Sequence, residues 1–381
     1  MSPTPAVAGP TPTAKFVRRV LAMSRKEVAH VRRDPGMLYL AIGMPLLLIL
    51  IFGFGVRFDA DDLPIAVVDL DRSAESRALI REVVASGDLV LAGEPSGVPE
   101  AEAMLRANRA VAAVVIPVDA GARLARGEGV TAQLLVDGTD GTIANVLLAN
   151  TQALAASVSA SMSRRPPAIV PSVSTRYNPA GESAMFLLPG TIAYVLALVS
   201  VLLTALAVAR EWERGSMEQL FATSIGIPEI VVGKLLPYVG LGLIDVLLSL
   251  ALGATVFDLP FRGSLVWIGL GSLLFILGML GQGLLISIVT RSQMLATQLG
   301  ALSAMLPSLL LSGFMFPVDN LPLPFKILST VVPARFLVTL LRSVLLKGGG
   351  FAEVWTDLVG LALFGIVTVT ASSLAFKRRI A

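Results

Sequence analysis

The stretch that decides the fold is SAMFLLPGTIAYVLALVSVLLTALAVA, residues 183–209, which contains no charged side chain. A helix that crosses about 30 Å of hydrocarbon needs roughly 20 mostly apolar residues, at about 1.5 Å per residue. Helices in the cores of soluble proteins are seldom so long and so uniformly apolar. We therefore interpret this stretch as a membrane-spanning helix and look for others of its kind.

Five further stretches satisfy the same criterion. The six predicted spans are residues 37–56, 183–209, 235–257, 264–290, 292–316 and 355–376. Between the first two spans lies a segment of ordinary soluble composition, 57–182. The predicted fold class is an α-helical polytopic membrane protein with six transmembrane helices and an extracytoplasmic α/β domain between helices 1 and 2.

The composition agrees with a membrane protein. Hydrophobic residues make up 55% of the chain and charged residues 15%, whereas soluble domains carry about 45–50% and about 25%. The chain has no cysteine, which excludes a disulfide scaffold, thiolate metal sites and thiol catalysis. A net charge of only +3 gives no support for a nucleic-acid partner.

The positions of Lys and Arg predict the orientation. Basic residues gather in 15–33, before the first span, and in the tail 377–381. The positive-inside rule then puts both termini and the loop 210–234 in the cytoplasm, and 57–182 and 317–353 outside. Four basic residues in the second outer segment favour the opposite orientation, but less strongly: Lys326, Arg335, Arg342 and Lys347. We expect a multi-pass protein of a bacterial cytoplasmic membrane.

The N-terminal region divides into two parts. Residues 1–14 are rich in Pro, Thr and Ala, which predicts disorder. Residues 15–36 predict a cytoplasmic interfacial helix, because Val17, Val20, Leu21, Val28 and Val31 fall near one helical face. A solvated basic tail is the alternative.

The outer segment 57–182 alternates strand and helix patterns. Strands are predicted at 63–69, 110–117 and 131–136, and helices at 73–86, 99–108 and 142–163, followed by a Pro-rich linker at 164–171. Asp69, Asp71 and Asp137 suggest a metal site, but their spacing lacks the ligand density of a calcium loop. We interpret them as turn and cap residues and predict no metal site.

The second outer segment, 317–353, is apolar but interrupted by four prolines. Irregular backbone at membrane depth is tolerated only where protein or a wet cavity shields it. A re-entrant hairpin with residues 334–346 as its amphipathic limb and a simple surface loop are equally consistent with this pattern.

Several enzyme classes find no support in the sequence. No Walker A motif is present, because Gly233-Lys234 is followed by Leu235. The single histidine, His30, and the lack of a nucleophile elbow argue against Ser/His/Asp catalysis. We expect no catalytic residue, no bound cofactor and no metal in this chain.

Two intramembrane groups suggest a polar pathway. Asp245 is an ionisable residue in the third span, and Gln282 on the next span is its expected hydrogen-bond partner. An ion-coupled carrier would normally show several such groups and two related halves, which are not found. Asp245 either is neutralised within the bundle or lines a pathway. Small residues in the fifth span predict close helix packing, within one subunit or across a dimer: Ala296, Gly300, Ala304 and Ser308.

The loop 210–234 contains the most informative pattern, REWERGSMEQLF at 210–221. Glu211, Arg214 and Glu218 are spaced so that their charges can pair along one helical face. Met217, Leu220 and Phe221 supply an apolar counterface. Such an element, tied to a membrane helix at each end, can transmit force from a soluble partner. A solvated loop would not need this apolar face.

The whole chain resembles the ABC-2 family of ATP-binding-cassette transporter permeases. The resemblance rests on R-E-x-E-R-G-[ST]-x-E-x-L at 210–220, Gly-Lys-Leu-Leu-Pro at 233–237, Ser-Gly-Phe-x-Phe-Pro at 312–317, Leu-Pro at 321–322 and the spacing from Pro333 to Arg342. The large outer domain resembles the drug-efflux branch. Ser216 stands where many relatives have threonine.

The resemblance implies a permease dimer, homodimeric or heterodimeric, docked to separate P-loop ATPase subunits that bind ATP and Mg. It leaves open a periplasmic adaptor. It implies that the coupling contact is made by Arg210, Glu211, Glu213, Arg214, Gly215, Met217, Glu218, Leu220 and Phe221. Phe314, Phe316 and Pro317 are predicted to form an outer gate.

The leading hypothesis is therefore an exporter permease, which moves amphiphilic small molecules such as drugs, or lipids, out of the cytoplasm or inner leaflet. Two alternatives belong to other classes. One is an ion-coupled secondary carrier that uses Asp245, and the other is a membrane receptor or scaffold with an outer ligand-binding domain.

Overall fold

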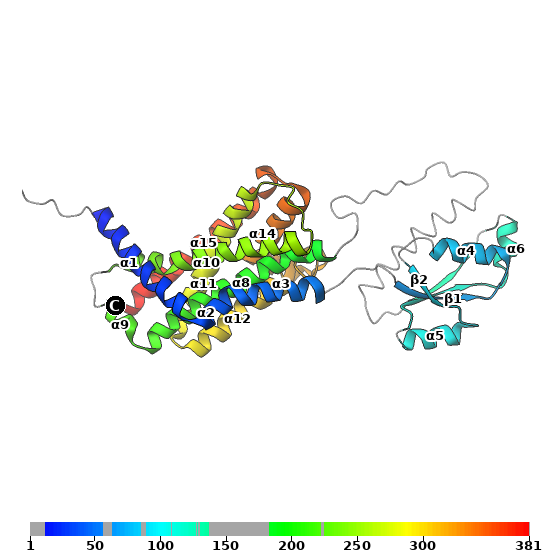
Figure 1. Cartoon of the computed structure of the whole chain (residues 1–381), viewed down its shortest axis with the longest axis horizontal. Coiled ribbons are helices and arrows are strands. Elements are labelled where there is room, and N and C mark those ends of the chain that lie inside the picture. The colour runs from blue at the N-terminus through cyan, green and yellow to red at the C-terminus, as the bar shows by residue number, and fades with distance from the viewer. Residues whose placement is uncertain are drawn as a thin grey trace, which may run out of the picture. The chain divides into compact units, whose positions relative to one another are not determined.

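The structure, a computed structural model, describes residues 12–55, 63–84, 89–107, 109–126, 128, 130–136, 183–221 and 225–380. The chain divides into two compact units, which we describe separately (Figure 1). The helical unit is Met1–Arg57 with Glu182–Ala381, and the α/β unit is Phe58–Gly181. The predicted helix 142–163 and linker 164–171 lie outside the described residues. The predicted disorder of 1–14 lies outside them up to residue 11, but Pro12 already begins a helix.

The helical unit begins with α1 (Pro12–Arg33), α2 (Pro35–Leu38), a π-helical turn η1 (Tyr39–Gly43) and α3 (Met44–Gly55). Its second part contains α8 (Ser183–Glu213), α9 (Ser216–Phe221), α10 (Ile227–Val256), α11 (Leu265–Thr290), α12 (Gln293–Leu310), η2 (Val318–Asn320), α13 (Leu323–Ser329), α14 (Pro333–Arg342), η3 (Ser343–Lys347) and α15 (Phe351–Ile380).

Among the described residues, five helical segments are long and apolar enough to cross a membrane: Pro35–Gly55, Ala184–Glu213, Ile227–Val256, Leu265–Thr290 and Phe351–Phe376. A sixth candidate is the pair Leu323–Ser329 and Pro333–Lys347, which is bent by 82°. The predicted fifth span, 292–316, is helical only as α12 and is not among these candidates. Its polar residues Gln293, Thr297 and Gln298 lower its hydropathy, and α12 ends three residues after Pro307.

Helix α8 is the centre of the bundle. It is buried along nearly its whole length and packs against α3, α10, α11, α12 and α14. Small side chains allow the close approaches, because a Cβ on Gly283 would lie 2.3 Å from the carbonyl oxygen of Val201. The small residues of α12 are buried, and Gly300 faces Val201 on α8. This packing on α8 lies within one chain.

Several predicted bounds differ from the structure because charged residues extend the helices beyond the apolar stretches. Helix α10 begins at Ile227, so much of the predicted loop 210–234 is helical. Helix α15 includes the predicted tail up to Ile380. In α1, Val20 and Val31 pack on the bundle, but Val17, Leu21 and Val28 are exposed. The predicted apolar face of α1 is therefore not the face that packs against the bundle.

The segment 317–353 is not a surface loop. Helix α14 packs against α8, α11 and α15. Its residues Ala334, Leu337 and Leu341 are completely buried. The bend between α13 and α14 makes the segment a re-entrant hairpin or a broken span.

In Figure 1, α1, α9 and the C-terminus gather at one end of the helical unit. We call this the motif end, because it holds residues 210–221. We call the other end, where α8 begins, the gate end.

In the part of the α/β unit that the structure describes, four strands form one sheet in the order β2-β1-β3-β4. Its described elements are β1 (Leu63–Asp69), α4 (Ala74–Val84), β2 (Leu89–Gly93), α5 (Val98–Arg106), β3 (Ala112–Ile116), α6 (Ala120–Ala125) and β4 (Gln133–Val136). Strand β1 is parallel to β2 and β3, and β4 is antiparallel to β3. The sequence predicted neither β2 nor α6.

The core of this unit follows from strand alternation. Ile65 and Val67 point toward α4 and α6, whereas Ala66 and Val68 point toward α5. Asp69 accepts hydrogen bonds from the backbone N–H of Asp71 and Arg72 and from the Ser76 hydroxyl. These contacts make Asp69 a turn and cap residue, while Asp137 lies outside the described residues.

Candidate functional site at the motif end

The motif 210–221 contains a helix break. Gly215 has φ +69°, the left-handed region that favours glycine, and it separates α8 from α9. Glu211 and Glu218 therefore belong to different helices. The predicted pairing of Glu211, Arg214 and Glu218 along one helical face is wrong for this reason.

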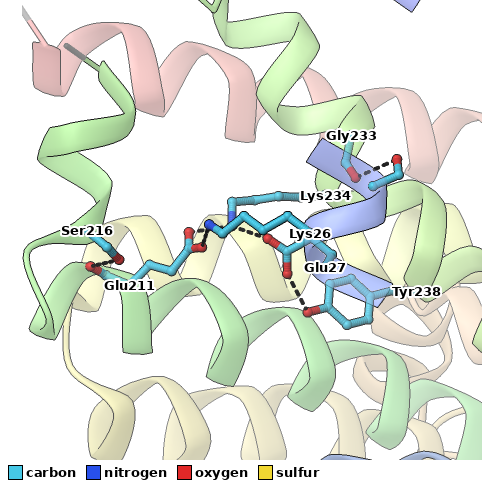
Figure 2. Close-up of polar contacts among 8 residues, drawn as sticks. Lys26, Glu27, Glu211, Ser216, Gly233, Lys234 and Tyr238 are labelled. Carbon is cyan, nitrogen blue, oxygen red and sulfur yellow. Dashed lines mark hydrogen bonds and ion pairs between the residues drawn. The ribbon is translucent and has the colours of Figure 1, made fainter. Parts of the chain in front are cut away.

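Glu211 instead belongs to a buried ion cluster, shown in Figure 2. Its carboxylate accepts hydrogen bonds from Lys26 on α1, at 2.7 Å, and from Lys234 on α10. Lys234 also donates to Glu27 on α1 at 3.0 Å, and the Tyr238 hydroxyl donates to Glu27 at 3.1 Å. We call Lys26, Glu27, Glu211, Lys234 and Tyr238 the ion cluster.

The ion cluster is balanced in charge, with two cations and two anions. Lys234 is only 1% exposed, and Glu27 and Glu211 are also buried. Buried ions are costly to desolvate, and removing one partner leaves the others uncompensated. The cluster is therefore a joint between α1, α8 and α10 that depends most on its buried members.

Helix α1 follows α10 closely on either side of this joint. A Cβ on Gly233 would lie 2.7 Å from Met23 and 3.2 Å from the carbonyl oxygen of Val20. Arg19 forms an ion pair with Glu229 at 3.2 Å. These contacts explain why the packed face of α1 is partly polar and not the apolar face that the sequence predicted.

The other charged residues of the motif bind two further elements. Arg210 forms an ion pair with Asp34, which caps α2, at 2.6 Å. The hydrogen bond from Arg210 lowers the pKa of the Asp34 carboxyl below its ordinary value. Glu213 accepts hydrogen bonds from the backbone N–H, at 2.7 Å, and from the side-chain amide of Gln293, at the start of α12.

The predicted coupling residues thus divide into two groups. Arg210, Glu211 and Glu213 hold other helices of the same chain. Arg214 and Glu218 are exposed, and their side chains form no hydrogen bond or ion pair with the residues that the structure describes. Met217 is completely buried and Leu220 half-buried, while the Phe221 side chain lies outside the described residues.

Sequence reasoning missed Lys26, Glu27, Lys234 and Tyr238. One signal was available, because Lys234 follows the apolar run 230–232 and precedes another, where an unpaired cation would be costly. Its partner on α1, Glu27, lies 207 positions away, in a segment that the sequence predicted as an interfacial helix.

The predicted pathway residues are not brought together. The Gln282 amide donates to the Ser303 hydroxyl on α12 at 3.0 Å, not to Asp245. Asp245 is buried and accepts a long hydrogen bond, 3.4 Å, from Ser249 on its own helix. The expected Asp245–Gln282 pair is wrong, because each of the two side chains binds another partner.

At the gate end, the three predicted gate residues also separate. Phe314 is completely buried, stacks on Tyr194 at 5.9 Å and meets Phe52 edge-on at 5.4 Å. Phe316 is 52% exposed, and Pro317 is exposed as well. Only Phe314 belongs to the packed cluster.

These features define a multi-pass helical membrane protein. At one end of its bundle, the N-terminal helix α1 is joined to α8 and α10, and the short helix α9 follows α8. Comparison with known proteins specifies the class further. Residues 36–374 match the model of the family described as ABC-2 family transporter protein. The chain belongs to this family.

Two of the most similar relatives have Escherichia coli (strain K12) as their source. The protein named probable multidrug ABC transporter permease YbhS is 33% identical over 95% of this chain and 98% of its own length. The protein named probable multidrug ABC transporter permease YbhR is 26% identical over 95% and 99%. ABC transporter G family member 20 of Dictyostelium discoideum is 30% identical over 53% of this chain and 28% of its own length.

Proposed function

We propose that this chain is the permease subunit of an ABC exporter that moves amphiphilic small molecules or lipids out of the cytoplasm or the inner leaflet. Family membership and the names of the relatives, which are called multidrug permeases, support this proposal. The observation that carries it lies at the motif end. There the segment 210–221 is joined to α1, α10 and α12 and also presents two exposed charged side chains, Arg214 and Glu218.

In this proposal α9 and the turn before it form the contact with the ATPase subunit. Arg214 and Glu218 supply exposed charges of opposite sign for a complementary partner surface, and the buried Met217 anchors α9. A displacement of α9 passes through Glu211 to α1 and α10, and through Glu213 to α12. The ATPase subunits bind and hydrolyse Mg-ATP, and this chain supplies no catalytic group.

The proposed orientation rests on the positive-inside rule. We place the motif end in the cytoplasm, because basic residues concentrate in α1 and in the C-terminal tail. The N-terminus and the C-terminus then lie on the cytoplasmic side of a bacterial inner membrane, and the α/β unit lies outside. An even number of crossings needs one span besides the five candidates, and in this proposal it is α12, which packs along α8, rather than the bent pair α13 and α14.

Two permease copies and two ATPase subunits complete the transporter in this proposal. The copies are identical or closely related. The α/β unit is the natural place for a periplasmic adaptor to bind, whereas a nucleic-acid partner has no support.

The test is co-purification of the full-length chain with a subunit that carries a Walker A sequence and hydrolyses Mg-ATP. Reversing the exposed charges with Arg214→Glu and Glu218→Arg should reduce its retention about tenfold, since like charges then face each other. The matched control reverses Arg126 and Glu128, an exposed pair in the α/β unit, and should leave retention unchanged. Equal retention in both variants, or no ATPase in the native sample, contradicts the proposal.

A further inference from the structure

Arg342, the last residue of α14, donates hydrogen bonds to three backbone carbonyls at the gate end. Its guanidinium Nη1 donates to Gly313 at 2.9 Å, and Nη2 donates to Phe186 at 3.0 Å and to Phe314 at 3.5 Å. The guanidinium also lies over the Phe186 ring, 3.9 Å from its centroid. Phe186 belongs to the first turn of α8, and residues 311–317, which we call the gate segment, follow the end of α12.

Within the described part of the chain, this guanidinium forms no ion pair with a carboxylate, and its Nε is buried without an acceptor. A guanidinium normally pairs with carboxylate or phosphate in two parallel bonds. Here carbonyl dipoles and one aromatic face take that place. Each of these contacts is weaker than an ion pair. Because the partners are neutral, breaking the contacts leaves no second buried charge behind.

Besides Arg342, the packing of Phe314 and local hydrogen bonds hold the gate segment. Gly313 has φ +83°, and the chain is not helical between Leu311 and Pro317. Among the described residues, its other hydrogen bonds are local, to the end of α12, within the segment and to η2, so Arg342 supplies those that reach α14. Arg342 also fixes Phe314, whose ring covers Gly190 and Tyr194 on α8.

We propose that Arg342 is the positioning residue that locks the gate, by fastening the gate segment and the start of α8 to α14. This inference rests on the proposed transport function, since it assigns the closed state of the pathway to a particular side chain. Movement of the gate segment away from α8 breaks the bonds to Gly313 and Phe314 or the bond to Phe186. Opening therefore requires the guanidinium to exchange its carbonyls for water or for a polar group of the cargo.

The absence of cysteine from the chain allows a direct test. Ala197 is completely buried on α8 and lies one turn beyond Tyr194, on the face that Gly190 and Tyr194 share beneath Phe314. In the full-length chain in liposomes, Ala197→Cys is a single target for a membrane-impermeant maleimide. Its modification rate reports access past the gate.

We expect Ala197→Cys to be protected with Arg342 in place. Arg342→Gln should raise its modification rate about tenfold or more, which equals about 1.4 kcal/mol in gate closure. Arg342→Lys should give an intermediate rate, because one ammonium cannot bridge the carbonyls of two segments. Arg335→Gln is the matched control: it removes the same charge from the same helix, but the Arg335 side chain binds Ser329 and not the gate segment.

Unchanged protection in folded Arg342→Gln, or equal acceleration in Arg335→Gln, would overturn the proposal. If Arg342→Gln yields no folded protein, Arg342→Lys decides alone, and protection as complete as in the native chain refutes the lock. The assay needs neither ATPase nor nucleotide. Failure of the proposed transport function would leave these rates unaffected, so the two failures can be distinguished.

Discussion

Lys234 and Arg342 are two cations of the helical unit. Their partners on α8, Glu211 and Phe186, are 25 residues apart, which is about 38 Å at about 1.5 Å per residue. At the motif end, Lys234 is bound by two carboxylates, Glu27 and Glu211, in a cluster of balanced charge. At the gate end, Arg342 is bound by carbonyls and an aromatic ring. The same problem, a charge within an apolar bundle, thus has two different solutions.

The difference indicates two mechanical roles. Opening the ion cluster would expose several uncompensated charges to an apolar environment, so α1, α8 and α10 should move as one body. Releasing Arg342 from its carbonyls leaves no carboxylate uncompensated, so the gate segment can separate at lower cost. A rigid joint near the proposed ATPase contact and a releasable lock at the opposite end suit a transporter driven from one side.

The largest effect should come from breaking the joint with Lys234→Met. This change leaves Glu27 and Glu211 buried with one cation fewer, which should cost about 3–5 kcal/mol of stability. Thermal unfolding of the purified chain and trypsin cleavage within α1 measure it. The control Lys26→Met removes a cation that is 48% exposed and should cost about 1 kcal/mol or less. Equal losses in both variants would mean that burial does not set the strength of the joint.

A smaller effect should follow from Gly190→Ala at the gate end. The added methyl group would lie 2.3 Å from the Phe314 ring, which must move away from α8. Overpacking of this kind costs about 1–3 kcal/mol. The maleimide rate at Ala197→Cys should rise, while protection of α1 from trypsin stays native. Loosening of α1 would contradict the separation of the two ends.

Asp34→Asn should have a modest effect of about 1 kcal/mol, because the Asp34–Arg210 pair is partly exposed. Since the hydrogen bond lowers the folded-state pKa of Asp34, its contribution is present above the ordinary pKa of about 3.9 and is lost as the pH falls through the lowered value. The stability difference between native and variant chains should therefore shrink below about pH 4. A difference that persists there would show that charge is not its cause.

The smallest effect is expected from Asp245→Asn. The amide keeps the shape of the side chain and its contact with Ser249, so folding and ATP-driven transport should be unchanged. Transport of a fluorescent amphiphilic dye by the reconstituted permease and ATPase measures the outcome. Complete loss of transport with intact ATP hydrolysis would favour the ion-coupled alternative.

The sequence predicted the features that depend on local pattern. Uniform apolar stretches located the five candidate spans, and short runs of β-forming residues located β1, β3 and β4. It did not locate β2 or α6, because Leu89–Gly93 and Ala120–Ala125 are short and their stability comes from packing on neighbouring elements.

The contacts of the motif within the bundle were not predicted from the sequence, and its role as the ATPase contact stays a prediction. The motif 210–221 correctly indicated a segment connected to membrane helices, yet Glu211 was assigned to a partner surface and lies inside the bundle. The reason is that ion pairs such as Glu27–Lys234 connect residues far apart in sequence, which no local spacing rule detects. Gly215 was the one local sign that the charges on either side do not share a helix.

The central claim is that an ATPase acting at the motif end opens the gate end. The most direct measurement is the maleimide rate at Ala197→Cys in liposomes, with and without the ATPase subunit and Mg-ATP. We predict that Mg-ATP raises this rate only when the subunit is present, and that reversal of Arg214 and Glu218 abolishes the increase. A rate that does not respond to Mg-ATP in the complex, or that rises as much in the chain alone, would contradict the account.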